Sequence, residues 1–160
     1  MKKLITTLLL TTIISTMSPV TSTKAATPLS NTQTTITQLG NGYYAETTIE
    51  QPAELQNQNG IALLSTSKRI TRTKTTILKN ATGTVLWSLS ITATFSYNGT
   101  SSSCISCSHN TKVSHKSWSI KKATSSKRGN TATAIATAKC INKEQSACVT
   151  ISCDKNGKVS

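Results

Sequence analysis

The sequence TVLWSLSITATFSY, residues 84–97, decides the fold that we expect for this chain. Apolar side chains occupy every second position from Val85 to Tyr97, and hydroxyl side chains occupy most of the positions between them. Side chains of a β-strand point alternately to opposite faces, so this alternation predicts one long strand with an apolar face and a polar face. Turn-forming residues flank the strand, with Gly83 before it and an Asn-Gly pair after it. The rest of the chain must therefore cover the apolar face.

Further strands are expected on both sides of this segment. Upstream, two alternating runs flank a Gly-Asn-Gly turn and predict a β-hairpin within residues 34–50, and residues 68–78 predict another strand. Downstream, strands are predicted at residues 100–108, 117–123, 131–141 and 147–153, and the intervening segments, such as residues 110–116 and 142–146, are expected to be loops or turns. Helical periodicity is absent from the sequence after residue 26. The predicted fold is all-β: an antiparallel β-sandwich, Ig-like in general architecture, with an N-terminal β-hairpin extension.

The first 26 residues have the composition of a secretory signal peptide. Lys2 and Lys3 precede an apolar stretch diluted by Thr, and small residues at the end of the segment suit cleavage. The apolar stretch is too short and too rich in Thr to span a bilayer, and a second hydrophobic segment does not follow it. We therefore expect an exported, extracellular protein without a transmembrane span, from which residues 1–26 are removed.

Charge divides the remaining chain in two. Residues 27–67 hold three acids and no base, a charge of −3, whereas residues 68–160 hold fifteen bases and two acids, a charge of +13. We expect the first part to be a polar acidic segment with a β-hairpin and linker, and the second to be the basic β-sandwich domain. A positive field of this size favours anionic partners such as cell-wall polymer or an acidic surface. The alternative is a solvated surface that only keeps the protein soluble. The expected anionic-surface contacts are Lys121, Lys122, Lys127 and Arg128.

Several stretches of the chain carry a resemblance to a known family. They are residues 40–50 (GNGYYAETTIE), 84–104 (TVLWSLSITATFSYNGTSSSC), 117–138 (SWSIKKATSSKRGNTATAIATA) and 149–160 (VTISCDKNGKVS). The chain resembles a family of small secreted proteins from Firmicute bacteria, a domain of unknown function without an established activity. The resemblance covers most of the chain after residue 26. It implies export and a β fold, and it implies no catalytic or binding residue.

The strand pattern places the first cysteines of the chain. A two-residue turn at residues 98–99 would pair Ala93 with Cys104, so that Cys104 points inward and Cys107 points outward. Cys153 would lie on the inner face of the last strand. Two inward cysteines far apart in an exported chain predict a buried disulfide, Cys104–Cys153.

A second bridge is less well defined by the pattern. Cys140 and Cys148 flank a predicted turn and could form a cross-strand pair, although alternation places them on opposite faces. A β-bulge between them would be needed to bring them to one face. Cys107 would then be left free or available for an intermolecular bond.

The titratable residues do not predict a metal site or an active site. Cys104, Cys107, His109 and His115 invite a zinc interpretation, but zinc needs converging ligands and the predicted strand places the two cysteines on opposite faces. A G-x-S-x-G motif is missing from the sequence, and the five carboxylates lie on separate elements, which disfavours a paired-carboxylate hydrolase. The lysines are not accompanied by a row of aromatic side chains, so nucleic acid is not expected as a partner.

These observations favour a non-enzymatic extracellular binding or structural module that prefers anionic surfaces. The alternative is a basic secreted effector of the antimicrobial type, which acts on membranes and should expose an apolar surface beside its lysines. A hydrolase is the third hypothesis and would need a pocket that holds a histidine or a carboxylate pair. We expect no cofactor.

Overall fold

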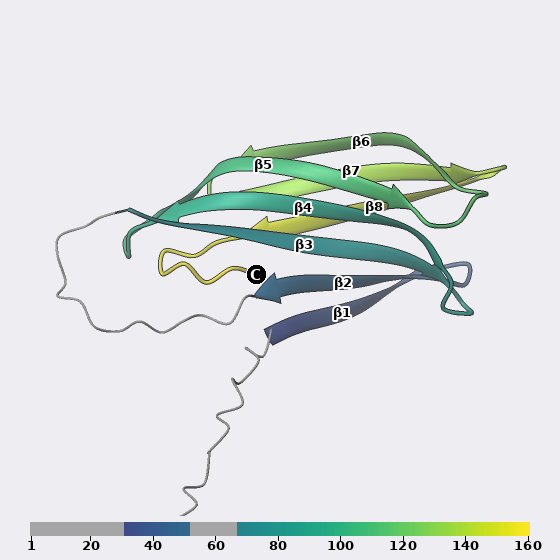
Figure 1. Cartoon of the computed structure of the whole chain (residues 1–160), viewed down its shortest axis with the longest axis horizontal. Coiled ribbons are helices and arrows are strands. Elements are labelled where there is room, and N and C mark those ends of the chain that lie inside the picture. The colour runs from purple at the N-terminus through teal and green to yellow at the C-terminus, as the bar shows by residue number, and fades with distance from the viewer. Residues whose placement is uncertain (1–30, 52–66) are drawn as a thin grey trace, which may run out of the picture.

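The computed structural model describes residues 31–51 and 67–160. These residues form eight antiparallel strands in two packed sheets and no helix (Figure 1). The strands are β1 (Asn31–Gly40), β2 (Tyr43–Gln51), β3 (Lys68–Asn80), β4 (Val85–Tyr97), β5 (Ser102–Val113), β6 (Ser119–Arg128), β7 (Thr131–Cys140) and β8 (Lys143–Ser152). The antiparallel β-sandwich is confirmed. The predicted signal peptide, residues 1–26, and most of the predicted linker lie outside the described residues.

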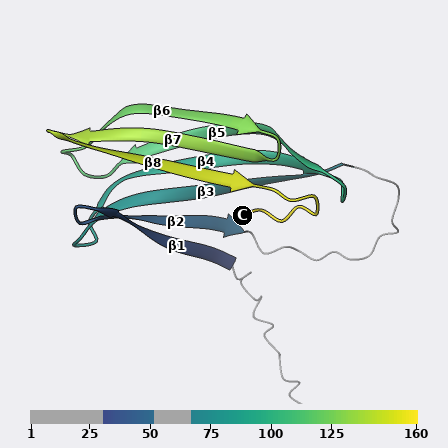
Figure 2. The same cartoon turned by 180° about the vertical axis from the view of Figure 1, so that it is seen from behind.

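The two sheets are meanders that follow one another along the chain. The larger sheet has the order β1-β2-β3-β4-β5 and the smaller sheet the order β6-β7-β8. The chain crosses from the larger sheet to the smaller sheet at the β5–β6 connection, so β5 and β6 lie side by side at one edge of the sandwich (Figure 2). An immunoglobulin domain instead exchanges strands between its sheets by Greek-key connections. The likeness is therefore to a two-layer sandwich in general and not to the immunoglobulin strand order.

Strand β4 lies in the larger sheet between β3 and β5, and its alternation is the one predicted. The side chains of Trp87, Leu89, Ile91 and Phe95 are fully buried on its inner face, and the Ser and Thr residues that alternate with the inward positions are half-buried on the outer face. The opposing sheet presents the small buried side chains of Ala132, Ala134, Ala136 and Ala138 from β7. Small residues on one layer admit large residues from the other, so the two layers can pack closely.

The β1–β2 hairpin is confirmed, and it forms the two outermost strands of the larger sheet. Strand β2 pairs with β3 from Tyr43–Asn80 to Ile49–Lys74, and Ile49 is buried in the core. Glu46 of β2 forms an ion pair with Lys79 of β3, and this hydrogen bond raises the pKa of the Lys79 ammonium. The predicted boundary between the acidic segment and the basic domain, at residues 67–68, therefore separates β2 from β3, which are neighbouring strands of one sheet.

The turn between β4 and β5 differs from the predicted two-residue turn. Tyr97 pairs with Ser102 and Phe95 with Cys104, so the connection contains four residues. The reason lies in the Asn98 side chain, whose Oδ1 accepts the N–H groups of Thr100 at 3.0 Å and Ser101 at 2.8 Å. Asn side chains commonly cap turns in this way. The register moves by two residues, so Cys104 still faces inward as predicted.

Several strands are longer than the sequence pattern indicated. Strand β5 continues to Val113, where a loop was predicted for residues 110–116, and β8 begins at Lys143, where a turn was predicted for residues 142–146. Both extensions are mostly polar and exposed, so they show no apolar alternation. Backbone pairing with β4 and β7 holds them in the strand conformation, which the side-chain pattern alone cannot reveal.

Candidate functional site

Four segments that are far apart in the sequence converge at one end of the sandwich, on the left in Figure 1. They are the start of β3, the β4–β5 turn, the β6–β7 turn and the segment after β8. Lys68 pairs with Tyr97, and Gly99 N donates to Lys155 O at 2.8 Å. Cys104 N donates to Gly129 O at 2.7 Å, which ties the β6–β7 turn to the same end.

This end of the sandwich carries seven lysine and arginine side chains, and we call it the basic end. Its members are Lys68, Arg69, Arg72, Lys127, Arg128, Lys155 and Lys158. Within the described residues, none of these side chains forms an ion pair with a carboxylate. Asp154 lies among them, but its Oδ1 accepts the backbone N–H groups of Asn156 at 2.9 Å and Lys158 at 2.8 Å. That carboxylate thus shapes the last turn of the chain instead of neutralising a side chain.

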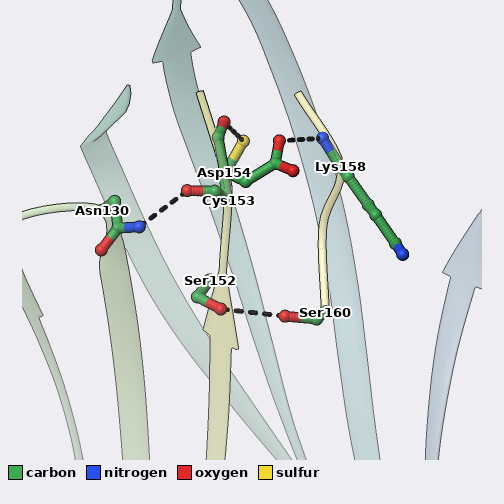
Figure 3. Close-up of a pocket in the computed structure, with 6 residues that line it drawn as sticks. All are labelled: Asn130, Ser152, Cys153, Asp154, Lys158 and Ser160. Carbon is green, nitrogen blue, oxygen red and sulfur yellow. Dashed lines mark hydrogen bonds between the residues drawn. The ribbon is translucent and has the colours of Figure 1, made fainter. Parts of the chain in front are cut away.

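A shallow pocket of about 280 Å³ opens at the basic end (Figure 3). It is lined by Asn130, Ser152, Cys153, Asp154, Lys158 and Ser160. Its polar groups are largely bonded to one another: Asn130 Nδ2 donates to Cys153 O at 2.8 Å, and the hydroxyls of Ser152 and Ser160 are 3.0 Å apart. The ammonium group of Lys158 points away from the pocket (Figure 3). The pocket lining contains no histidine and no pair of carboxylates, which are the groups that we required for a hydrolase.

The four predicted surface contacts do not form one patch. Lys127 and Arg128 lie at the basic end, whereas Lys121 and Lys122 lie six positions earlier on β6, about 20 Å away along the strand. Lys121 also forms an exposed ion pair with Glu144, with an N–O distance of 2.6 Å. The sequence prediction grouped them because they are close in the chain, but an extended strand separates its two ends.

Lys127 has a second role that the sequence did not reveal. It pairs with the buried Ala132, so its side chain leaves the inner side of β6 and donates to the carbonyl of Ile105 on β5. Nearby, His109 Nδ1 and Ser125 Oγ are 3.0 Å apart across the same two strands. These two contacts join the sheets along the edge at which β5 and β6 meet.

Cys107 faces inward, and the prediction that it points outward is wrong. Cys104 pairs with Phe95 and Cys107 with Ala93, because a β-bulge after Cys104 adds one residue to β5. Phe95 and Ala93 are buried on the inner face, so both cysteines lie on that face. Burial raises the pKa of the Cys104 thiol, and the neighbouring Cys107 thiol raises it further.

All five cysteines have free thiols in the structure, so neither predicted disulfide is formed in it. Cys104 and Cys153 are both buried, and their backbone N–H groups bond to adjacent residues of the β6–β7 turn, Gly129 and Asn130. Burial also raises the pKa of the Cys153 thiol. The Cys104–Cys153 bridge stays a prediction for the oxidised protein.

The structure does not bring Cys140 and Cys148 together. Cys140 pairs with Lys143, whereas Cys148 pairs with Ile135 on the exposed face of the smaller sheet. The two cysteines are five positions apart along the ladder, about 16 Å, and the β7–β8 pairing has no register shift that would turn them to one face. The bulge on which this second bridge depended is therefore absent between β7 and β8.

Thiol accessibility tests this arrangement directly. In the native reduced protein, we expect an alkylating reagent to modify the exposed Cys148 within minutes, and Cys104 and Cys153 only after denaturation, because burial keeps these thiols protonated and out of reach. Peptide mapping by mass spectrometry reads the result. If Cys104 and Cys153 resist alkylation in denatured, non-reduced protein but react after reduction, they are bridged. Equal labelling of all three in the native state would contradict their placement.

The two histidines each contact a serine, but neither pair has the surroundings of a catalytic dyad. His115 Nδ1 lies 2.8 Å from Ser117 Oγ, and His109 contacts Ser125 as described. A nucleophilic serine needs its histidine oriented by a third group, and neither histidine bonds to a carboxylate in the described part of the chain. Residues 31–51 and 67–160 also contain no group of three or more His, Cys, Asp or Glu residues placed to hold a metal ion.

The chain matches no protein-family model, and no curated protein or solved structure is significantly similar to it. The resemblance to secreted Firmicute proteins therefore stays a prediction. None of the described residues forms a helix that is long and apolar enough to cross a bilayer.

Proposed function

We propose that this protein is an exported, non-enzymatic binding module that attaches to an anionic polymer of the cell wall through its basic end. The observation that carries the proposal is the gathering of seven cations, from three separate segments, without a carboxylate partner in the described residues. Solvated lysines that serve only solubility need no common location. A phosphate-rich polymer can contact several of these cations at once, because it presents its charges at regular intervals.

The frame around these cations supports binding without catalysis. Arg69 and Arg128 extend from paired strands, and Lys155 lies in a turn whose carbonyl oxygen is held by Gly99 N. The backbone positions that carry these side chains are therefore fixed relative to one another, so a polymer does not have to order the backbone when it binds. Most polar groups of the adjoining pocket are hydrogen-bonded to one another, so few donors inside it remain for an anion.

Charge reversal at the basic end tests the proposal. In the full chain, we expect Arg128→Glu combined with Lys155→Glu to weaken retention on immobilised poly(glycerol phosphate) about tenfold or more at physiological salt, since each charge near an anionic surface contributes about 1 kcal/mol. The matched control is Lys112→Glu combined with Lys116→Glu, which changes net charge equally at the opposite end. Retention should also fall steeply as salt rises, because the screening length is about 8 Å at physiological ionic strength.

Two outcomes would contradict this function. If both double variants lose retention equally, the polymer senses net charge and the basic end is not a site. If retention is independent of salt, binding is not electrostatic. The full chain is required because a fragment of residues 68–160 would lack the strand that pairs with β3.

A further inference from the structure

The β7–β8 turn lies at the end of the molecule opposite the basic end and projects beyond the neighbouring turns (Figures 1 and 2). Its first residue, Ile141, exposes 88% of its surface, more than any other large hydrophobic side chain among the described residues. Single exposed apolar residues on a strand are ordinary. An almost fully exposed isoleucine at a projecting tip is a different case, because nothing in the described chain shields it from water.

The backbone of Ile141 is also unfavourable. Its φ angle is +51°, in the left-handed region that β-branched residues rarely adopt. The β1–β2 turn places Asn41 at nearly the same angle, +53°, and Asn is a residue that tolerates this region. Isoleucine at position 141 should therefore make the folded protein less stable than Asn would, for two independent reasons: its apolar side chain is exposed to water, and its backbone is strained. Strain that persists at an exposed position points to a function outside the fold.

The surroundings of Ile141 indicate the chemistry of its partner. Lys139 and Lys143 flank the turn, and both are exposed. The acid beside them, Glu144, is already paired with Lys121 at 2.6 Å. Lys143 Nζ lies 6.0 Å from the centre of the Tyr43 ring, at the outer limit of a cation–π contact, so this exposed cation stays available to a partner. Glu144 lies opposite Lys139 in the ladder, but its ion pair is with Lys121. The tip thus consists of one apolar side chain with an exposed lysine on each side.

We propose that the β7–β8 tip anchors the protein to an anionic lipid bilayer. Ile141 enters the boundary between headgroups and acyl chains, and Lys139 and Lys143 contact the headgroup phosphates. A hydrophilic polymer offers no apolar environment for Ile141, whereas a bilayer interface offers both an apolar environment and negative charge. This surface is separate from the basic end, so the two binding activities are independent of each other.

The test compares two isoleucines in the full chain at constant net charge. Ile141→Asn removes the apolar tip, and Ile135→Asn removes an isoleucine that is 49% exposed in the middle of the smaller sheet. The probe is a vesicle of phosphatidylglycerol and phosphatidylcholine, with pure phosphatidylcholine vesicles as the uncharged comparison, in a co-sedimentation assay. We expect Ile141→Asn to weaken binding to the anionic vesicles roughly five- to tenfold, the range expected when partial burial of one isoleucine is lost. Ile135→Asn should leave binding unchanged, and Ile141→Leu should retain it.

The same variant separates anchoring from folding, because the two effects have opposite signs. Ile141→Asn should raise the melting temperature by about 2–4 °C as backbone strain is relieved, while it weakens vesicle binding. Unchanged vesicle binding, or equal loss in both Asn variants, would overturn the proposal. A matching loss of retention on poly(glycerol phosphate) would assign the tip to the polymer and overturn the lipid assignment. Reduced polymer retention in the basic-end variant, with vesicle binding intact, would leave the two functions distinct.

Discussion

Replacing Trp87 with Ser should lower the free energy of unfolding by about 3–5 kcal/mol, a large part of the stability of a domain of this size. Trp87 is fully buried, and its cross-strand neighbours are Leu78 on β3 and Val113 on β5. The layer opposite supplies alanines, which are too small to close the cavity left by the indole. Urea denaturation, followed by far-ultraviolet circular dichroism, measures the change.

Trp87→Phe should be much milder, within about 1.5 kcal/mol of the unsubstituted chain. The indole N–H of Trp87 is buried and has no hydrogen-bond partner in the described structure. A buried donor without a partner costs about 1–3 kcal/mol, and phenylalanine removes this donor while it keeps most of the apolar volume. Ser88→Ala, on the outer face of the same strand, is the control and should have little effect. Equal damage from Phe and Ser would show that the indole N–H has a partner in solution.

The apolar alternation of residues 84–97 was sufficient to predict β4 and its facing. Burial of Trp87, Leu89, Ile91 and Phe95 follows from that pattern, because only one face of the strand contacts the other layer. The alanine face of β7 is predictable for the same reason. The β1–β2 hairpin was equally clear from its Gly-Asn-Gly turn.

Single-residue departures from regular pairing were not predictable. The Asn98 side chain lengthens the β4–β5 turn, and the bulge after Cys104 adds one residue to β5. Residues before a bulge keep the expected facing and residues after it change faces, which is why Cys104 was placed correctly and Cys107 was not. Neither feature alters the composition or periodicity of the sequence around it.

The candidate site was only half predictable, because a sequence shows charge but not where separated segments meet. Lys127 and Arg128 were identified from the β6–β7 turn, but Lys68 and Lys155 join them only through the pairing of β3 with β4 and the docking of the last turn. The tip residue Ile141 was hidden in the same way, since its exposure and positive φ exist only once β7 and β8 pair as a two-residue hairpin.

The docking of the last turn depends on a close contact between Gly157 and Tyr97. Gly157 is buried at a φ of +90°, and a Cβ atom placed on it would lie 2.4 Å from the Tyr97 ring. This contact presses the turn after β8 against the end of β4, and Gly99 N bonds to Lys155 O beside it. Val159 follows this turn, is 4% exposed and belongs to the core, and it forms an antiparallel bridge with Cys153.

Gly157→Ala should therefore destabilise the protein by about 2–4 kcal/mol, from positive-φ strain and from overlap with the ring. Gly99→Ala is the matched control, because Gly99 has a similar φ of +84° but nothing within 4 Å of an added Cβ, so we expect a loss of only about 1 kcal/mol. Urea denaturation midpoints give both values.

In a Tyr97→Leu background, the added cost of Gly157→Ala should fall to that of Gly99→Ala, since the ring is gone. Because Lys155 and Lys158 belong to this turn, Gly157→Ala should also weaken retention on poly(glycerol phosphate), whereas Gly99→Ala should not. Equal costs for the two alanine variants would show that the Tyr97 ring does not hold the turn in place.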